Sequence, residues 1–314
     1  MAPRSSEALA ITVGTRGSRL ALSQTNGIVT ALREHHPDLA VEVKQIKTQG
    51  DRDQQTSLTT IGGQGIFVKE LEAVLLAGDI DVAVHSLKDV PSEIAPGLVI
   101  AAYPQRAEPR DALVTRDGKT LAELPAGARI GTGSRRRAVQ IKTLRPDIEL
   151  VDIRGNVDTR IRKVDEGEYD GAVLAYAGLA RLDMADRASQ IFEVDELVPA
   201  VGQGALAIEA RQDDADLLEL LASISDANTK LACETERAFM ARLGGGCQLP
   251  FGAYAEISDH SLKIRGFISD DDGQRRLQGE LEVSVEEAPG VGTRLAERLL
   301  GEGAAEFIAA AEAS

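Results

Sequence analysis

The chain has 314 residues, of which 43% are hydrophobic and 3% aromatic, and its formal net charge is −15 at pH 7. This length is enough for two or three domains with ordinary cores. The negative charge and the lack of tryptophan argue against a nucleic-acid-binding protein, because such proteins present basic surfaces and stacking aromatic rings.

The two cysteines, Cys233 and Cys247, are too few for a disulfide framework, so we expect a reducing compartment. The first ten residues lack the apolar run of a signal peptide, and no apolar run approaches the length of a membrane span. The four histidines show no metal-ligand spacing. These features predict a cytoplasmic protein with no metal and with neither membrane nor nucleic acid as a partner.

Short β-type runs alternate with helical patterns over the first two thirds of the chain. In chain order we expect a strand at 10–13, a helix at 20–34, a strand at 39–46, a helix at 68–77, and strands at 81–84, 99–103 and 112–115. A glycine turn after residue 130 leads into a helix at 135–144, followed by strands at 149–153 and 172–175. This order predicts an α/β fold with doubly wound, mostly parallel sheets and helices on both faces.

The last third of the chain has a different pattern. We expect a helix at 227–243, strands at 253–257, 262–268 and 277–283, and a final helix at 291–311, which together predict a small α+β domain. Residues 212–225 would be its linker, and 104–110 and 199–203 would be two crossings between the larger lobes. Two crossings predict a hinge with the ligand in the cleft between the lobes. The expected domains are 1–103 plus 199–222, 104–198, and 223–314.

Two strand-to-helix turns resemble each other, at 13–19 and at 130–136. Each has a Gly-Thr turn, a serine at the expected N-cap (Ser18 and Ser134) and a basic first helical turn. An ordinary strand-to-helix turn uses the same residues. Arginine at a helix N-terminus is, however, opposed by the helix dipole. Finding it twice therefore favours two anion sites at these helix N-termini.

Further arginines follow separate strands of the second lobe. Arg154 comes at the end of the expected strand 149–153, Arg160 lies one turn into the next helix, and Arg181 follows the strand 172–175. Guanidinium groups pair with carboxylates and phosphates through two parallel hydrogen bonds. Arg135, Arg136 and Arg137 are consecutive and point about 100° apart on a helix, so one or two of them can be merely solvated. The pattern predicts a small ligand with several negative charges.

Two further segments carry residue types suited to chemistry. Lys88 and Asp89 follow the buried strand 81–84, at the sheet edge where open α/β sheets bind ligands, although a solvated charge pair would look the same. Cys247 lies in a glycine-rich turn and is the candidate reactive thiol, whereas Cys233 lies in an apolar helical stretch and is expected to be structural. The polar, glycine-rich segment 48–65 is either a lid or disordered.

Taken together, these segments resemble the porphobilinogen deaminase family, also called hydroxymethylbilane synthases. The resemblance is carried, in the family's order, by Gly14-Thr15-Arg16 with Ser18, Phe67 to Leu71, His85 to Pro91, Arg136-Arg137, Arg154 to Val157 with Arg160, Ala177-Gly178-Leu179 with Arg181, Pro199 to Gly204, and Gly245 to Gln248. These segments cover nearly the whole chain.

The resemblance implies three α/β domains, the first two similar to the lobes of periplasmic binding proteins, and a monomer. It implies that Cys247 carries a dipyrromethane cofactor through a thioether. Four porphobilinogens are added head to tail, each releasing ammonia, and water then releases hydroxymethylbilane. The catalytic residue would be Asp89. Cofactor contacts would come from Lys88, Asp89, Thr132, Ser134, Arg136, Arg137 and Arg160, and substrate contacts from Arg16, Ser18, Arg154, Arg160 and Arg181.

These residue types suit that chemistry. Each pyrrole carries an acetate and a propionate, so the growing chain is a polyanion that arginines can hold. Loss of ammonia leaves an electron-poor azafulvene, and attack on it places positive charge on pyrrole nitrogens, which a carboxylate such as Asp89 would stabilise.

The chain departs from the family pattern at four positions. Gln64 and Thr60 stand where the family often has lysine, and Gly133 and Arg135 replace a commoner serine and leucine. Two other functions explain part of the pattern: a non-catalytic two-lobed anion-binding protein, and a thiol enzyme acting on an anionic substrate.

Overall fold

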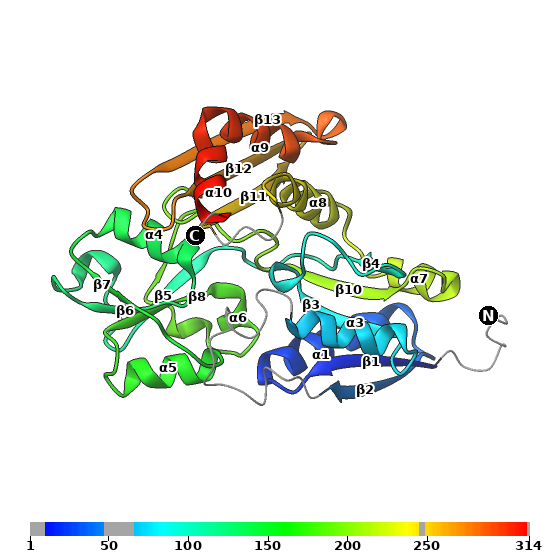
Figure 1. Ribbon diagram of the computed structural model, residues 1–314. Coiled ribbons are helices and arrows are strands. Elements are labelled where there is room, and N and C mark those ends of the chain that lie inside the picture. Colours follow the sequence, from blue (N-terminus) through cyan, green and yellow to red (C-terminus); the bar gives the residue numbers. More distant parts are fainter. Residues whose placement is uncertain (1–9, 47–65, 245–248, 313–314) are drawn as a thin grey trace. The chain divides into compact units, whose positions relative to one another are not determined.

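The computed structural model describes residues 10–46, 66–244 and 249–312. The fold divides into two compact units, each built from two stretches of chain (Figure 1). Unit 1 comprises Met1–Arg106 and Ala205–Lys230, and unit 2 comprises Ala107–Gly204 and Leu231–Ser314. Within the described ranges, no helix is both long enough and apolar enough to cross a membrane.

Unit 1 is built on a five-stranded sheet with the strand order β2-β1-β3-β10-β4. Its strands are β1 (Ala10–Arg16), β2 (Ala40–Ile46), β3 (Val82–Ser86), β4 (Leu98–Ala102) and β10 (Leu206–Arg211), and its helices include α1 (Arg19–His35), α3 (Ile66–Leu76) and α7 (Ala215–Ala222). Strands β2, β1 and β3 are parallel, and β10 runs antiparallel between β3 and β4.

Alternation along β3 places helices on both faces of this sheet. Val82 and Val84 pack in one apolar cluster with α1 and α7, whereas Ala83 packs in another with α3. Successive strand side chains point to opposite faces, so a short, fully apolar strand is buried on both sides. The strands and helices expected over 10–103 are confirmed, with ends shifted by a few residues.

The expectation of a linker at 212–225 is wrong, because α7 occupies most of it. Asp214 caps this helix by accepting a hydrogen bond from the Leu217 N–H at 3.3 Å. Leu217, Leu220 and Leu221 then pack into the core of unit 1. Their spacing of three and four residues is that of one helix face, so the segment is part of the fold.

The first part of unit 2 repeats the plan with the strand order β7-β6-β8-β5-β9. Its elements are β5 (Asp111–Thr115), β6 (Arg129–Gly131), α4 (Arg135–Leu144), β7 (Glu149–Val151), α5 (Val157–Asp165), β8 (Gly171–Ala175), α6 (Tyr176–Ala180) and β9 (Gln190–Ile191). Strands β7, β6 and β8 are parallel, and β5 is antiparallel to β8 and β9.

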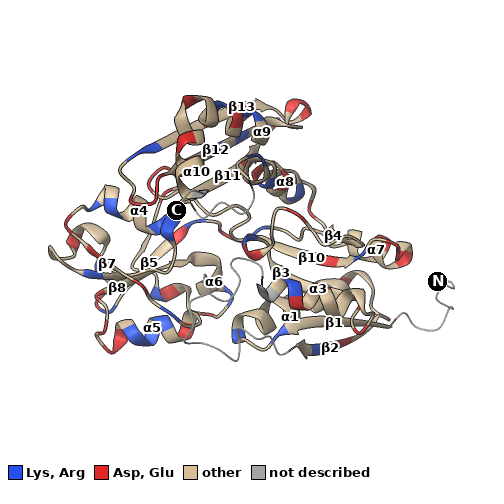
Figure 2. Ribbon diagram, viewed as in Figure 1, with Lys and Arg blue, Asp and Glu red and all other residues tan. Residues whose placement is uncertain are grey.

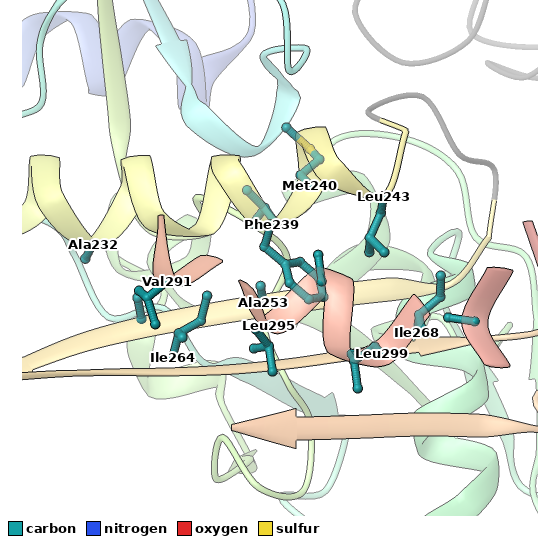
Figure 3. Packing of buried hydrophobic residues seen from close by; sticks show 14 of the residues in the cluster. Ala232, Phe239, Met240, Leu243, Ala253, Ile264, Ile268, Val291, Leu295 and Leu299 are labelled. Atoms are coloured by element: carbon teal, nitrogen blue, oxygen red, sulfur yellow. The ribbon is translucent and has the colours of Figure 1, made fainter. Parts of the chain in front are cut away.

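The C-terminal part packs helices on a three-stranded antiparallel sheet. It comprises the larger part of α8 (Ala227–Arg242), β11 (Phe251–Ser258), β12 (Ser261–Ser269), β13 (Arg276–Ser284), α9 (Val291–Leu299) and α10 (Ala305–Glu312). Phe239 of α8 and Leu243, which follows that helix, meet Ile264 of the sheet and Leu295 and Leu299 of α9 (Figure 3). The α+β domain is confirmed, and with it the predicted fold class.

The single helix expected at 291–311 is interrupted. A π-helical segment, Leu300–Ala304, separates α9 from α10, and Gly303 within it has a φ of 123°. That value lies in the region that only glycine adopts readily. Gly303 is therefore the residue that allows the change of direction.

A buried carboxylate joins the two parts of unit 2. Glu236 of α8 is fully buried, and it accepts hydrogen bonds from the Gly202 N–H at 2.7 Å and from the Ala255 N–H at 2.8 Å. Gly202 lies in the segment that follows β9, and Ala255 lies in β11. One side chain thus satisfies two backbone amides from segments far apart in sequence.

Candidate functional site

The first group of predicted site residues shares one sheet edge in unit 1. Strands β1 and β3 are parallel neighbours, with Val13 opposite Val82, so their carboxyl ends lie at the same edge. Arg16 ends β1, Ser18 follows as the N-cap of α1, and Lys88 and Asp89 follow β3 in a short 3-10 turn. The structure therefore brings these four residues to one edge, as expected for a binding site in an open α/β sheet.

The turn that carries Asp89 is held by buried contacts. The Leu87 N–H donates to the Ala205 carbonyl at 3.0 Å, and Leu87 is 1% exposed. The buried His85 Nε2 lies 2.9 Å from Glu209 Oε2. Asp89 itself is exposed. An exposed carboxylate on a rigid base is placed to act on a ligand, since its own position does not depend on the ligand.

Both predicted helix N-caps are confirmed. Ser18 Oγ accepts a hydrogen bond from the Ala21 N–H at 3.2 Å, and Ser134 Oγ accepts one from the Arg137 N–H at 3.4 Å. Thr132 Oγ1 accepts a further bond from the Ser134 N–H at 3.2 Å. A hydroxyl that accepts in this way can still donate its own proton to an anion. The helix dipole favours negative charge at the same place.

The second group of predicted residues shares one edge in unit 2. Strands β7, β6 and β8 are parallel neighbours, so the segments that follow them leave the sheet at one edge. The segments carry Thr132 and Ser134 after β6, Arg154 after β7 and Arg181 after β8 and α6. The strand expected at 149–153 ends at Val151, which places Arg154 in the following loop.

Arg160 of α5 is a desolvated cation beside like charges. Burial lowers its pKa to about 10, Arg137 and Arg154 lower it too, and Asp152 opposes them. Its Nε donates to the Gly155 carbonyl at 2.8 Å. Gly155 has a φ of 109°, and a Cβ there would lie 2.8 Å from the Thr159 Cβ, so only glycine fits. The guanidinium stays charged at neutral pH, which makes the edge strongly attractive to anions.

Arg181 is the other partly buried cation of this group. Burial lowers its pKa to about 10, and its Nη2 donates to the Gly204 carbonyl at 2.7 Å. Figure 2 shows lysine and arginine on α4 and α5 among acidic residues of the same unit. The chain as a whole has a negative net charge, so the positive charge that Arg160 and Arg181 bring to this edge is not a general property of the chain.

Arg136 and Arg137 share one buried carboxylate, that of Asp111. Asp111 Oδ2 lies 2.7 Å from Arg136 Nη1, and Oδ1 lies 2.8 Å from Arg137 Nη2 and 2.9 Å from its Nε. The side chains of the two arginines are 7% and 8% exposed, and that of Asp111 is 0% exposed. Burial would raise the pKa of Asp111, but Arg136 and Arg137 hold it at about 2.

Arg135, the first of the three consecutive arginines, binds a different carboxylate. Its Nη1 lies 2.7 Å from Asp271 Oδ1, in the loop between β12 and β13. The interpretation that one or two of the three are solvated fits Arg135 alone, whose side chain is 51% exposed, whereas Arg136 and Arg137 are buried. Sequence reasoning did not identify Asp111 as a functional residue. The available signal was a charged residue opening the apolar strand Ala112 to Val114.

The chemistry of the donors at the unit 2 edge fits a ligand rich in carboxylates. It combines two capping hydroxyls with buried or partly buried guanidinium groups, and Arg160 is desolvated beside two like charges that Asp152 opposes. The expected reactive thiol, Cys247, and the expected lid, 48–65, lie outside the described residues.

Comparisons with known proteins identify relatives over nearly the whole chain. The chain is similar to the porphobilinogen deaminase from Roseiflexus sp. (strain RS-1), with 50% identity over 95% of this chain and 98% of the relative. It is 48% identical to that of Syntrophotalea carbinolica, over 96% of each. Among solved structures, it is similar to a nutrient binding protein from Burkholderia cenocepacia bound to methionine, with a TM-score of 0.42 and 16% identity over 70% of this chain and 93% of that chain.

Two family models divide the chain between them. Residues 11–219 match the dipyrromethane cofactor-binding domain of porphobilinogen deaminase, and residues 230–301 match its C-terminal domain. The resemblance stated from the motifs is thereby confirmed, together with the enzyme class and the cofactor. The chain belongs to the porphobilinogen deaminase family, and it is accordingly a transferase with a dipyrromethane cofactor.

Proposed function

We propose that this chain condenses four porphobilinogens head to tail into hydroxymethylbilane, with release of ammonia, on a dipyrromethane primer joined to Cys247 by a thioether. The observation that carries the proposal is Arg160, which is desolvated beside Arg137 and Arg154 and is therefore suited to a polyanion. We further propose that the chain acts as a monomer in the cytoplasm.

Asp89 is the proposed catalytic residue. When bound, the dipyrromethane supplies the nucleophilic pyrrole carbon onto which the chain is extended. A carboxylate oxygen of Asp89 accepts hydrogen bonds from pyrrole N–H groups as positive charge develops on them, and it accepts or returns protons in the same steps. The buried base beneath the turn keeps this carboxylate in place.

The predicted binding residues divide between two proposed tasks. Lys88, Asp89, Thr132, Ser134, Arg136, Arg137 and Arg160 would bind the primer, and Arg16, Ser18, Arg154, Arg160 and Arg181 would bind the substrate. Each acetate or propionate takes two parallel hydrogen bonds from a guanidinium or one from a hydroxyl. The pyrrole chain gains negative charge as it lengthens, so a series of separate cations suits it better than a single site.

The intact mass of the purified protein tests this function. We expect a mass that exceeds the sequence mass by two pyrrole units, a colour with a pyrrole-specific aldehyde reagent, and ammonia release on addition of porphobilinogen. A fully active chain of unmodified mass would refute the covalent primer. A modified chain that consumes no porphobilinogen would refute the reaction.

Replacing Arg160 by glutamine is expected to lower kcat/KM for porphobilinogen by about 10- to 100-fold. A charge-assisted hydrogen bond is worth about 1.5–3 kcal/mol, and about 1.4 kcal/mol corresponds to tenfold in rate. The same change removes the repulsion from Arg137 and Arg154 together with the hydrogen bond to the Gly155 carbonyl, so the melting temperature should change little. Steady-state kinetics and thermal unfolding measure the two effects.

Arg162→Gln is the matched control for Arg160→Gln, because Arg162 lies on the same helix but is 59% exposed and pairs with Glu166 at 2.8 Å. This control is expected to keep its activity. Equal kcat/KM values in the two variants would contradict a binding role for Arg160.

A further inference from the structure

The buried cluster of Asp111, Arg136 and Arg137 has more positive than negative charge. Among the described residues, one carboxylate faces two guanidinium groups, so this cluster of three side chains has one net positive charge although each is at least nine-tenths buried. A buried charge without a counter-ion is strongly unfavourable. Burial lowers the pKa of Arg136, Asp111 opposes this shift, and Arg137 adds to it.

Asp111 also sets where the two guanidinium groups lie. Its two oxygens are divided between them, Oδ2 toward Arg136 and Oδ1 toward Arg137. Backbone carbonyls complete the arrangement, because Arg136 Nη1 donates to Val198 at 2.6 Å and Arg137 Nη1 donates to Val173 at 3.1 Å. A guanidinium has five N–H donors, so these bonds do not exhaust either side chain.

Gln203 fixes the carboxylate from its other side. Its Nε2 donates to Asp111 Oδ1 at 2.9 Å and to the Pro109 carbonyl at 2.7 Å, and Gln203 is 0% exposed. Asp111 is therefore held by an amide, two guanidinium groups and the rigid strand β5 that it begins. Its position is determined without any ligand.

We infer that Asp111 is a positioning residue for the reaction: it holds Arg136 and Arg137 side by side at the N-terminus of α4 and leaves them one net positive charge for the anionic primer. This inference rests on the proposed function. Asp111 acts through the two arginines and need not touch the primer, so its removal affects the alignment of the primer and not the binding of free porphobilinogen.

Asp111→Asn tests this role, because it removes the charge with almost no change of shape. Cofactor content is measured with the pyrrole reagent, and kinetics are expressed per cofactor-loaded molecule. We expect kcat to fall at least about tenfold while KM for porphobilinogen stays within about twofold, since the arginines act on the primer. Asp147→Asn is the control, because Asp147 also pairs with an arginine, Arg145 at 2.7 Å, but is 41% exposed.

The outcomes separate the possible roles of Asp111. If the cofactor-loaded Asp111→Asn enzyme has a normal kcat and a lower melting temperature, Asp111 is purely structural and the inference is overturned. A fall in kcat no larger than that of Asp147→Asn would overturn it as well. If Asp111→Asn does not fold, Gln203→Leu is the second variant, because it removes one hydrogen bond to the Asp111 carboxylate and leaves both ion pairs. The inference then requires that Gln203→Leu lower kcat while KM for porphobilinogen stays nearly unchanged. The intact mass of the wild-type protein and its turnover of porphobilinogen test the proposed function independently of these variants.

Discussion

Asp89→Asn is expected to give a folded, cofactor-carrying protein whose kcat is about a thousandfold below that of the wild type. The substitution keeps the shape of the side chain and removes its negative charge and basicity. Preorganised electrostatic groups at a reaction centre typically contribute about 10²- to 10³-fold, and general acid–base groups about 10²- to 10⁴-fold. Asp89 is exposed on a turn whose buried contacts come from neighbouring residues, so the fold should not depend on its charge.

Three measurements check this expectation: kcat with porphobilinogen, cofactor content by the pyrrole reagent, and the thermal unfolding curve. Asp38→Asn serves as the control, because Asp38 is an exposed aspartate of the same unit that precedes β2 and so lies near the amino end of that strand. Turnover near that of the control would exclude Asp89 as the catalytic carboxylate. A large loss of melting temperature in Asp89→Asn alone would instead assign it to the fold.

Cys247→Ser is expected to remove the covalent primer and, with it, turnover. Thioether formation needs a thiolate, and a serine hydroxyl is a far weaker nucleophile near neutral pH. The purified variant should therefore have the mass of the bare sequence and give no colour with the pyrrole reagent. Intact-mass spectrometry measures the first and absorbance the second.

The second cysteine supplies the control for Cys247→Ser. Cys233 is 0% exposed within α8, where a thiol acts as a small apolar side chain. Cys233→Ala should keep the adduct and the activity and lose about 1 kcal/mol of stability through the cavity that it leaves. An adduct that persists in Cys247→Ser would show that the primer is not attached to Cys247. An adduct that disappears in Cys233→Ala would contradict the structural role of Cys233.

Local signals were enough to predict the elements that begin with a capping residue or alternate clearly. Ser18 and Ser134 marked the starts of α1 and α4, and both caps have the expected hydrogen bonds. The sequence alone did not indicate β10, whose place between β3 and β4 depends on pairing with strands more than a hundred residues earlier. Non-local pairing of this kind leaves only a short apolar run in the sequence.

The candidate site shows the same division between local and non-local information. Arginines after parallel strands could be predicted to share an edge, because strand direction follows from the alternation of strands and helices. The partners of those arginines could not be predicted, since Asp111 is 25 or more positions from the arginines that it binds and Asp271 is more than a hundred from Arg135. The distinction between a cation held inside the protein and one available to a ligand therefore needed the structure.

The buried side chain of Glu236 has a consequence for how unit 2 melts. Its two oxygens accept from Gly202 and Ala255, and Ala255 lies in the same part as Glu236, so separating the C-terminal part from the preceding segment would break the hydrogen bond between the carboxylate and the Gly202 N–H. Each buried polar group that loses its partner is destabilised by about 1–3 kcal/mol. Partly unfolded forms with only one of the two parts intact are therefore sparsely populated, and heating is expected to disrupt both in a single cooperative transition.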